Sequence, residues 1–259
     1  MLLVPIATGA VLGGPVGNRV ILVLLLVVAA LGLFCARTPF EAWLGISPWR
    51  AQDPRERRVI YNALYTYSSV SLGALAIVFW QVRSSGLLLL GAAASAAFLA
   101  QALLRSRGRQ TRMASQLLGS IGLTAGAAAA YYVASARLDA NAFVIWAANW
   151  AFAANQILYV QTRLHSARAS RFGEKLRQGK WFVLGEFAMA SALALAWRKG
   201  WLPSLALLAF VPVLCRALPW FFSSSTRLHV RRLGFSELIH AVIFAVLLIV
   251  GFYFQGGRV

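Results

Sequence analysis

The sequence has few charged residues: Lys, Arg, Asp and Glu together make up 12% of its 259 residues. A soluble domain carries about 25% charged residues, so this chain has about half of what a water-exposed surface needs. Seven residues are acidic and two are cysteine, and two cysteines exclude a small secreted domain held together by several disulfides. These shortages exclude a water-soluble globular protein of this size.

Long apolar runs take the place of the missing charge, because 60% of the residues are apolar and the mean hydropathy is +0.70. A helix rises about 1.5 Å per residue, so about 20 apolar residues cross a hydrocarbon core of about 30 Å. Strands of a membrane barrel would alternate in polarity over about ten residues, whereas these runs are continuous. The sequence therefore predicts an all-α, polytopic bundle of transmembrane helices that forms a single domain over residues 1–259.

Seven runs are long enough to cross a membrane, and an eighth, Leu2–Ala36, is too long for one crossing. Gly13-Gly14-Pro15 inside it is a strong turn signal, so we expect two spans, Leu2–Gly14 and Val20–Ala36, and about nine in all. Because Leu2–Gly14 is too short to cross alone, we expect the natural protein to start upstream. The seven long runs are Ile60–Val82, Gly86–Leu104, Met113–Ala136, Ala140–Gln161, Trp181–Trp197, Trp201–Phe222 and Leu233–Phe254.

The basic residues alternate between the two sides of these spans. The connections after spans 2, 4, 6 and 8 hold 18 of the 25 Lys and Arg residues, the opposite side holds six, and Arg216 lies inside a span. Connections rich in Lys and Arg stay in the cytoplasm, so we expect a cytoplasmic N-terminus and an external C-terminus. The longest connections are expected at Arg37–Val59 and Thr162–Lys180. The expected location is the bacterial inner (plasma) membrane.

The net charge of +18 would indicate nucleic acid as the partner of a soluble protein. Here the basic connections are short and lack the interleaved aromatic residues on which bases stack. We therefore expect them to contact the anionic head groups of membrane lipids, and we expect no nucleic acid partner.

Polar residues inside the spans are the candidate site, because an ionisable side chain in hydrocarbon is costly. Glu186 and Arg216 each lie six residues from the cytoplasmic end of a span, and Glu237 and His240 share one helix face. This asymmetry predicts a cavity that opens toward the cytoplasm and binds a lipid or a small anion. The candidate ligand-binding residues are Asn149, Asn155, Arg163, Glu186, Arg216, Glu237 and His240.

A structural interpretation of the same residues stays open. Arg216 could extend to the membrane surface, or pair with Glu186 or Glu237 to hold three helices together. Glu237-x-x-His240 supplies two candidate metal ligands and no other motif completes the set, so we expect neither a metal site nor a cofactor.

Four stretches of the chain resemble the YwiC-like family of bacterial integral membrane proteins. They are Met1–Gly14 (MLLVPIATGAVLGG), Leu33–Pro39 (LFCARTP), Asn155–Ala167 (NQILYVQTRLHSA) and Leu233–Phe244 (LGFSELIHAVIF). Members of that family usually have a Glu-His-Gly stretch before the first span, and this sequence does not contain one there. The resemblance implies an integral membrane protein and assigns no reaction to it.

More distantly, the chain is similar to the UbiA-type intramembrane prenyltransferases, which also have nine helices and a cytoplasmic N-terminus. In those enzymes two aspartate-rich motifs hold Mg²⁺ on a prenyl diphosphate. The corresponding stretches here are Ala36–Glu41 (ARTPFE) and Asn155–Arg163 (NQILYVQTR), and neither contains an aspartate. The resemblance therefore implies a similar arrangement of helices without magnesium-dependent prenyl transfer.

Three functions stay open on the sequence. The first is a membrane protein that binds a lipid or small anion from the cytoplasmic side, the second a proton- or ion-coupled transporter, and the third a prenyltransferase with substituted metal ligands. The sequence contains no internal repeat of the kind that many carriers show, which disfavours the second. We favour the first function and assign no catalytic residue.

Overall fold

The computed structural model describes residues 2–14, 17–45, 53–108, 111–167, 169, 171–223 and 229–256. Within these ranges the chain consists of helices and connections and contains no strand. Eight helical segments of the described chain are long and apolar enough to cross a membrane, and a shorter apolar helix, α1, packs among them. The all-α, polytopic bundle expected from the sequence is therefore confirmed.

The helices match the expected spans closely in position. A short additional helix, α7, lies between the spans α6 and α8, and the span Leu205–Phe222 is built from three pieces, η2, α9 and α10. In chain order the helices are α1 (Leu3–Gly13), α2 (Asn18–Trp43), α3 (Pro54–Val82), α4 (Ser85–Ser106), α5 (Arg112–Ser135), α6 (Ala140–His165), α7 (Phe172–Gln178), α8 (Lys180–Arg198), η2 (Leu205–Phe210), α9 (Val211–Cys215), α10 (Leu218–Phe222) and α11 (Val230–Gly256).

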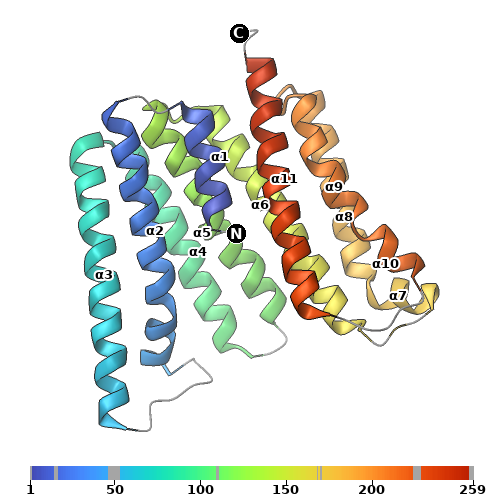
Figure 1. Ribbon diagram of the computed structural model, residues 1–259, viewed down its shortest axis with the longest axis horizontal. Coiled ribbons are helices and arrows are strands. Elements are labelled where there is room, and N and C mark those ends of the chain that lie inside the picture. The colour runs from blue at the N-terminus through green and yellow to red at the C-terminus, as the bar shows by residue number, and fades with distance from the viewer. Residues whose placement is uncertain are drawn as a thin grey trace.

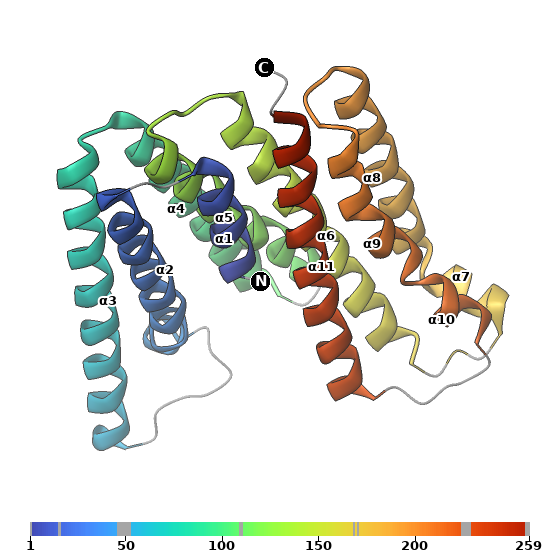
Figure 2. The same cartoon turned by 45° about the horizontal axis from the view of Figure 1, so that its top comes forward.

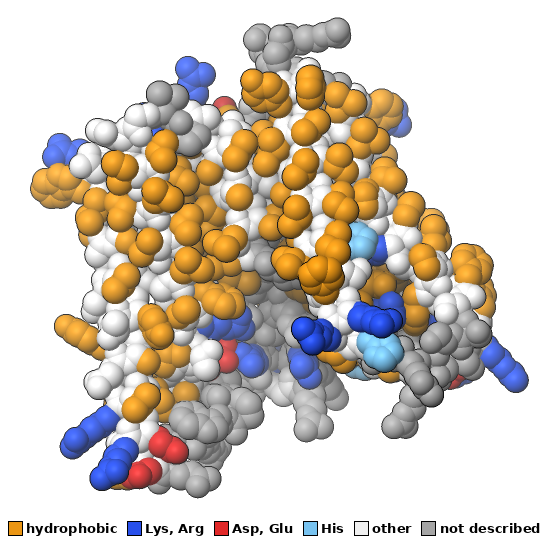
Figure 3. Space-filling model, viewed as in Figure 1, with side chains coloured by type: hydrophobic (Ala, Val, Ile, Leu, Met, Phe, Trp, Pro, Cys, Tyr) orange, Lys and Arg blue, Asp and Glu red, His pale blue; other side chains and the backbone are white. Residues whose placement is uncertain are grey.

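The connections alternate between the two ends of the bundle. α2, α4, α6 and α10 end at the lower end in Figure 1, and α1, α3 and α5 end at the upper end, where α11 also finishes. Lys and Arg side chains gather along the lower part of the face in Figure 3, and fewer lie along its upper edge. The basic connections therefore share one end of the molecule.

Two of the expected connections are too long. α2 continues through Pro39 to Trp43, and α3 begins at Pro54, where the Asp53 side chain accepts a hydrogen bond from the backbone N–H of Arg55 at 3.4 Å. The expected connection Arg37–Val59 is therefore wrong at both ends, because helices extend past the apolar stretch that hydropathy detects. The expected connection Thr162–Lys180 is likewise shortened, since α6 runs to His165 and α7 lies within it.

The expected span Trp201–Phe222 is interrupted rather than continuous. It begins with the 3₁₀ helix η2 and continues as the two five-residue helices α9 and α10. Pro212 and Pro219 lie at the starts of α9 and α10, and a proline has no backbone N–H to continue an α-helical hydrogen-bond ladder. The break between α9 and α10 places Arg216 outside a regular helix.

Helices approach most closely where one of them carries a glycine. A Cβ atom on Gly9 of α1 would lie 2.0 Å from the carbonyl oxygen of Ala127 in α5. A Cβ atom on Gly251 of α11 would lie 2.5 Å from Cα of Ala206 in η2. Small residues let backbones pack closely in a medium where lipid is as apolar as leucine, so these contacts determine how the helices fit together.

α1 lies between the two halves of the bundle, with one face buried against them and with Leu3 and Val11 exposed on the other. It packs against α5, α6 and α11, which all follow it late in the chain (Figures 1 and 2). On one side of it lie α2, α3, α4 and α5, and on the other lie α6, α8, α9, α10 and α11. The second group carries the candidate site.

Candidate functional site

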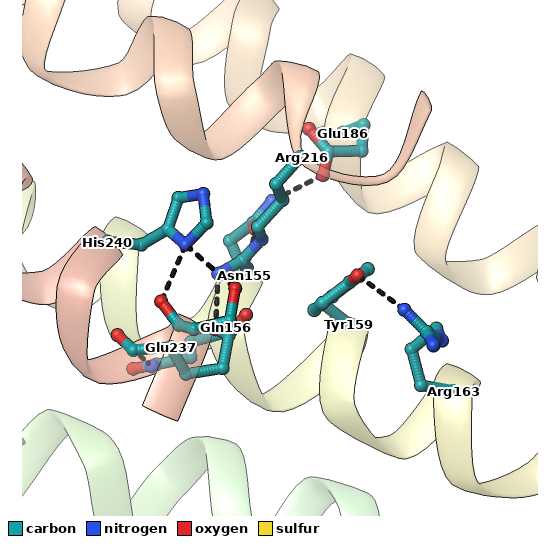
Figure 4. Close-up of polar contacts among 9 residues, drawn as sticks. Asn155, Gln156, Tyr159, Arg163, Glu186, Arg216, Glu237 and His240 are labelled. Carbon is teal, nitrogen blue, oxygen red and sulfur yellow. Dashed lines mark hydrogen bonds and ion pairs between the residues drawn. The ribbon is translucent and has the colours of Figure 1, made fainter. Parts of the chain in front are cut away.

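Four side chains from different parts of the second group form one hydrogen-bonded chain (Figure 4). Arg216, between α9 and α10, forms an ion pair with Glu237 of α11 and donates to Oδ1 of Asn155 in α6. The amide nitrogen of Asn155 then donates to Oε1 of Glu186 in α8 at 2.8 Å. We call Glu237, Arg216, Asn155 and Glu186 the polar network. It contains the ion pair between Arg216 and a glutamate that the sequence predicts.

The ion pair in this network is almost completely buried. The side chains of Arg216 and Glu237 are 2% and 6% exposed. Gln156 adds a further contact, because its Nε2 donates to the backbone carbonyl oxygen of Glu237 at 3.2 Å. A buried charge that loses its partner is strongly destabilising, so these contacts hold α6, α11 and the segment between α9 and α10 together.

Tyr159 connects the polar network to Arg163, one of the predicted residues. The Cζ atom of Arg216 lies 4.6 Å from the ring centroid of Tyr159, and Arg163 donates from Nη1 to the Tyr159 hydroxyl at 2.8 Å. Arg163 also lies over the ring of Trp220, at 5.5 Å. Tyr159 is not among the predicted residues, although the spacing of four from Asn155 to Tyr159 to Arg163 puts all three on one helix face.

Lys175 is a second residue that the sequence analysis did not select. It is fully buried in α7, although it was counted among the cations of a connection. Its Nζ donates to the carbonyl oxygen of Trp220 at 2.7 Å and to that of Ser223, so it binds the C-terminal end of α10. Burial, together with the nearby charge of Arg163, lowers the pKa of Lys175 from its ordinary value of 10.5. Lys175 therefore attaches α7 to α10 beneath the polar network.

Two of the predicted residues do not join the network. Asn149 lies apart from it, where its amide donates to Oγ1 of Thr8 in α1 at 3.0 Å and to the carbonyl oxygen of Ile145. His240 is close to Glu237 on α11, but its Nδ1 bonds to the carbonyl oxygen of Ser236 at 2.7 Å. The structure therefore unites Asn155, Glu186, Arg216 and Glu237, links Arg163 to them through Tyr159, and places Asn149 in a separate contact.

Several buried polar atoms at this site have no hydrogen-bond partner in the described part of the chain. Such atoms are costly in an apolar medium and mark places where water or a ligand binds. They are Oε1 of Gln156, Nε of Arg163, Oγ of Ser166, Oε2 of Glu186, Nε of Arg216 and Oε1 of Glu237.

An apolar groove with a volume of about 390 Å³ lies between α6 and α8 and reaches the polar network. Its walls include small side chains from both helices, among them Ala151 and Ala192. The groove ends where α6 and α8 converge, since a Cβ atom on Gly185 would lie 2.7 Å from Leu158. Asn155 lines this end of the groove and belongs to the polar network, so the two features form one site.

A second cavity, with a volume of about 470 Å³, lies in the other half of the bundle between α1, α2, α4 and α5. Its walls are mainly apolar, and Arg37 lies at its edge. Oε1 of Glu41 accepts hydrogen bonds from Arg37, at 2.9 Å, and from Arg105. This is the stretch that corresponds to the first aspartate-rich motif of the prenyltransferases, and its carboxylate is bound by two arginines.

No group of three or more His, Cys, Asp or Glu side chains arranged to hold a metal ion occurs among the described residues. The polar network supplies carboxylate, amide and guanidinium groups instead. It can therefore donate to and accept from a ligand at the end of an apolar groove.

Comparison with known proteins identifies the first half of the chain. The family model described as YwiC-like protein matches residues 1–131, and these residues run from α1 into α5. No curated protein and no solved structure matches the chain. The polar network lies after the matched residues, so the family assignment and the candidate site rest on different parts of the molecule. Because the match covers just over half of the sequence, the chain belongs to the YwiC-like family of proteins.

Proposed function

We propose that this protein is a membrane-embedded binding protein for an amphiphile, with the apolar chain of the ligand in the α6–α8 groove and its head group at the polar network. The observation that carries the proposal is the double role of Asn155. It lines the groove, and it also accepts from Arg216 and donates to Glu186. The apolar groove matches the hydrocarbon chain of a lipid-like molecule, and the buried hydrogen-bonding groups at its end match the polar head group.

The groove fits an extended hydrocarbon chain because its walls carry small side chains. Ala151 and Ala154 project from α6, and Ala188 and Ala192 project from α8. Lipid tails are as apolar as these walls, so a chain gains little by moving from the bilayer into the groove. Selection of the ligand therefore depends on the head group and the polar network.

In this proposal the head group faces the cytoplasmic half of the inner membrane, and the alkyl chain extends toward the opposite end of the bundle, where Trp201 and Leu202 line the groove. Glu186 and Glu237 lie near the starts of α8 and α11, toward the end of the bundle where α6 and α10 finish. Connections rich in Lys and Arg stay in the cytoplasm, where they also attract anionic lipid head groups. This orientation gives the network access to lipids of the inner leaflet.

Lipid analysis of the purified protein tests the proposal. The protein is purified in a neutral maltoside detergent, extracted with organic solvent and analysed by mass spectrometry. We expect the wild-type protein to carry an amphiphile in near-stoichiometric amount. Ala192→Trp, which fills the groove, should lose it.

Ala194→Trp is the matched control, because Ala194 is exposed on the same helix and does not line the groove. It should keep the amphiphile. Equal retention in both variants would place the ligand elsewhere, and a wild-type protein without any amphiphile would exclude the proposed function.

A further inference from the structure

The charges of the polar network do not balance. Glu186 and Glu237 contribute two carboxylates, and Arg216 contributes one guanidinium group. Arg216 is paired with Glu237, whereas the hydrogen-bond partner of Glu186 is the neutral amide of Asn155. Arg163 supplies no partner for Glu186, because its contacts are with the Tyr159 hydroxyl and the ring of Trp220. With both carboxylates ionised, the network itself is short of one positive charge.

The unpartnered atoms of the network point to the same shortage. Two of them are acceptors, Oε1 of Glu237 and Oε2 of Glu186, and one is a donor, Nε of Arg216. Glu237 is more than nine-tenths buried, so bulk water does not reach its side chain. A ligand that satisfies this site must therefore bring more hydrogen-bond donors than acceptors.

Glu186 is the acidic group of the network that lies next to the groove. Its neighbours Gly185, Ala188 and Met189 line the groove, and so does its partner Asn155. The Asn155 amide holds Oε1 of Glu186 at 2.8 Å, which leaves Oε2 as the unpartnered oxygen. A head group at the end of the groove contacts Asn155 and therefore lies beside the carboxylate that Asn155 holds.

We propose that the amphiphile of this site carries a cationic ammonium head group and that Glu186 is its counter-ion. This inference rests on the proposed function and adds the charge of the ligand. The ammonium group donates to Oε2 of Glu186, and its positive charge balances the carboxylate that Arg216 leaves unpaired. Its alkyl chain extends between α6 and α8.

A set of ligands with the same chain and different head groups tests the charge. Dodecylamine, dodecanol and dodecyl phosphate are titrated into purified protein in a neutral maltoside detergent at pH 7, and binding is measured as the shift in melting temperature. A hydrogen bond to a charged group contributes about 1.5–3 kcal/mol, so we expect dodecylamine to bind at least about tenfold more tightly than dodecanol. Glu186→Gln should remove this preference.

Two controls test whether a changed preference in Glu186→Gln comes from its net charge or from misfolding. Glu174→Gln changes the net charge equally at a residue of α7 outside the groove, so it should keep the preference for the amine. Dodecanol has no charge to lose, so its unchanged binding to Glu186→Gln shows that this variant is folded.

The outcomes separate the inference from the proposed function. Equal binding of amine and alcohol, or tighter binding of the phosphate, overturns the cationic head group, while loss of all binding in Ala192→Trp still supports the groove. If none of the three ligands binds the wild-type protein, the proposed function itself is wrong.

Discussion

The guanidinium group of Arg216 lies over the ring of Tyr159, with 4.6 Å between Cζ and the ring centroid. This contact comes in addition to the ion pair with Glu237, so Arg216 has both a carboxylate and an aromatic partner. A cation over an aromatic ring gains about 2 kcal/mol when the contact is shielded from water. Tyr159 therefore helps to hold a charge inside the membrane.

Substitution of Tyr159 separates the ring from the hydroxyl group. Tyr159→Leu should lower the free energy of unfolding by at least about 2 kcal/mol, because it removes the aromatic face under Arg216. Tyr159→Phe keeps the ring and loses only the oxygen that accepts from Arg163, so its loss should be smaller. Unfolding by denaturant in mixed micelles measures both. Equal losses would show that the hydroxyl group, and not the ring, matters.

Removal of one member of the ion pair should be more harmful than removal of both. Arg216→Met leaves Glu237 buried and unpaired, which should lower the free energy of unfolding by about 3–5 kcal/mol. Combination with Glu237→Gln should recover part of this loss, since no charge then stays unpaired. The same unfolding measurement applies. The combination of Arg216→Met with Glu186→Gln is the comparison. It should recover less of the lost free energy of unfolding, because Glu186 bonds to Asn155 and is not paired with Arg216. If the loss in the double variant with Glu237→Gln equals the sum of the losses in the two single variants, the ion pair between Arg216 and Glu237 is contradicted.

Gly9 should not tolerate a methyl group. Its Cβ would lie 2.0 Å from the carbonyl oxygen of Ala127, so α1 and α5 must separate in Gly9→Ala. Overpacking of this kind costs about 1–3 kcal/mol, measured as a lower melting temperature in detergent. Gly73→Ala in α3 is the control, because no atom lies within 4 Å of its Cβ position. It should be neutral or slightly stabilising, since alanine favours helix by up to about 1 kcal/mol.

Cysteine labelling tests the orientation of the chain. In a variant without the exposed Cys35 and Cys215, new cysteines are placed at Ser85 and Arg171, which are exposed near opposite ends of the bundle. A membrane-impermeant maleimide should label Ser85→Cys in intact cells and Arg171→Cys only after lysis. The reverse pattern would overturn the orientation derived from the basic residues.

Lys175 should make stability depend on pH in the alkaline range. Its pKa is lower in the folded protein than its ordinary value of 10.5, so between these two values the unfolded chain binds more protons at this residue. The free energy of unfolding should therefore rise with pH through this window. Lys175→Met lacks the titrating group and should show a flatter dependence. Identical pH profiles for the two proteins would show that the environment of Lys175 does not shift its pKa.

Apolar run length was enough to predict most helices of this fold, because a membrane helix must be about 20 residues long. The same signal misplaced the ends of α2 and α3, where helix continues into polar sequence. It also missed the interruption of Leu205–Phe222, although Pro212 and Pro219 inside that run favour one.

The candidate site was predicted by depth in the membrane, and depth does not say which way a side chain faces. Asn149 and Asn155 are six residues apart, which turns them about 120° away from each other on a helix with 3.6 residues per turn. Asn149 therefore contacts α1, while Asn155 contacts α8 and Arg216. Lys175 was missed for a different reason, since the burial of a short helix such as α7 depends on contacts with α10 that lie far along the chain.

The position of α1 has a consequence for how the protein is made. A ribosome synthesises α1 before its partners α5, α6 and α11. Gly9 cannot reach its contact with Ala127 until more than a hundred further residues have been translated and inserted into the bilayer. α1 thus waits in the bilayer for its final neighbours, and the two halves of the bundle are joined through it only after α11 has been inserted.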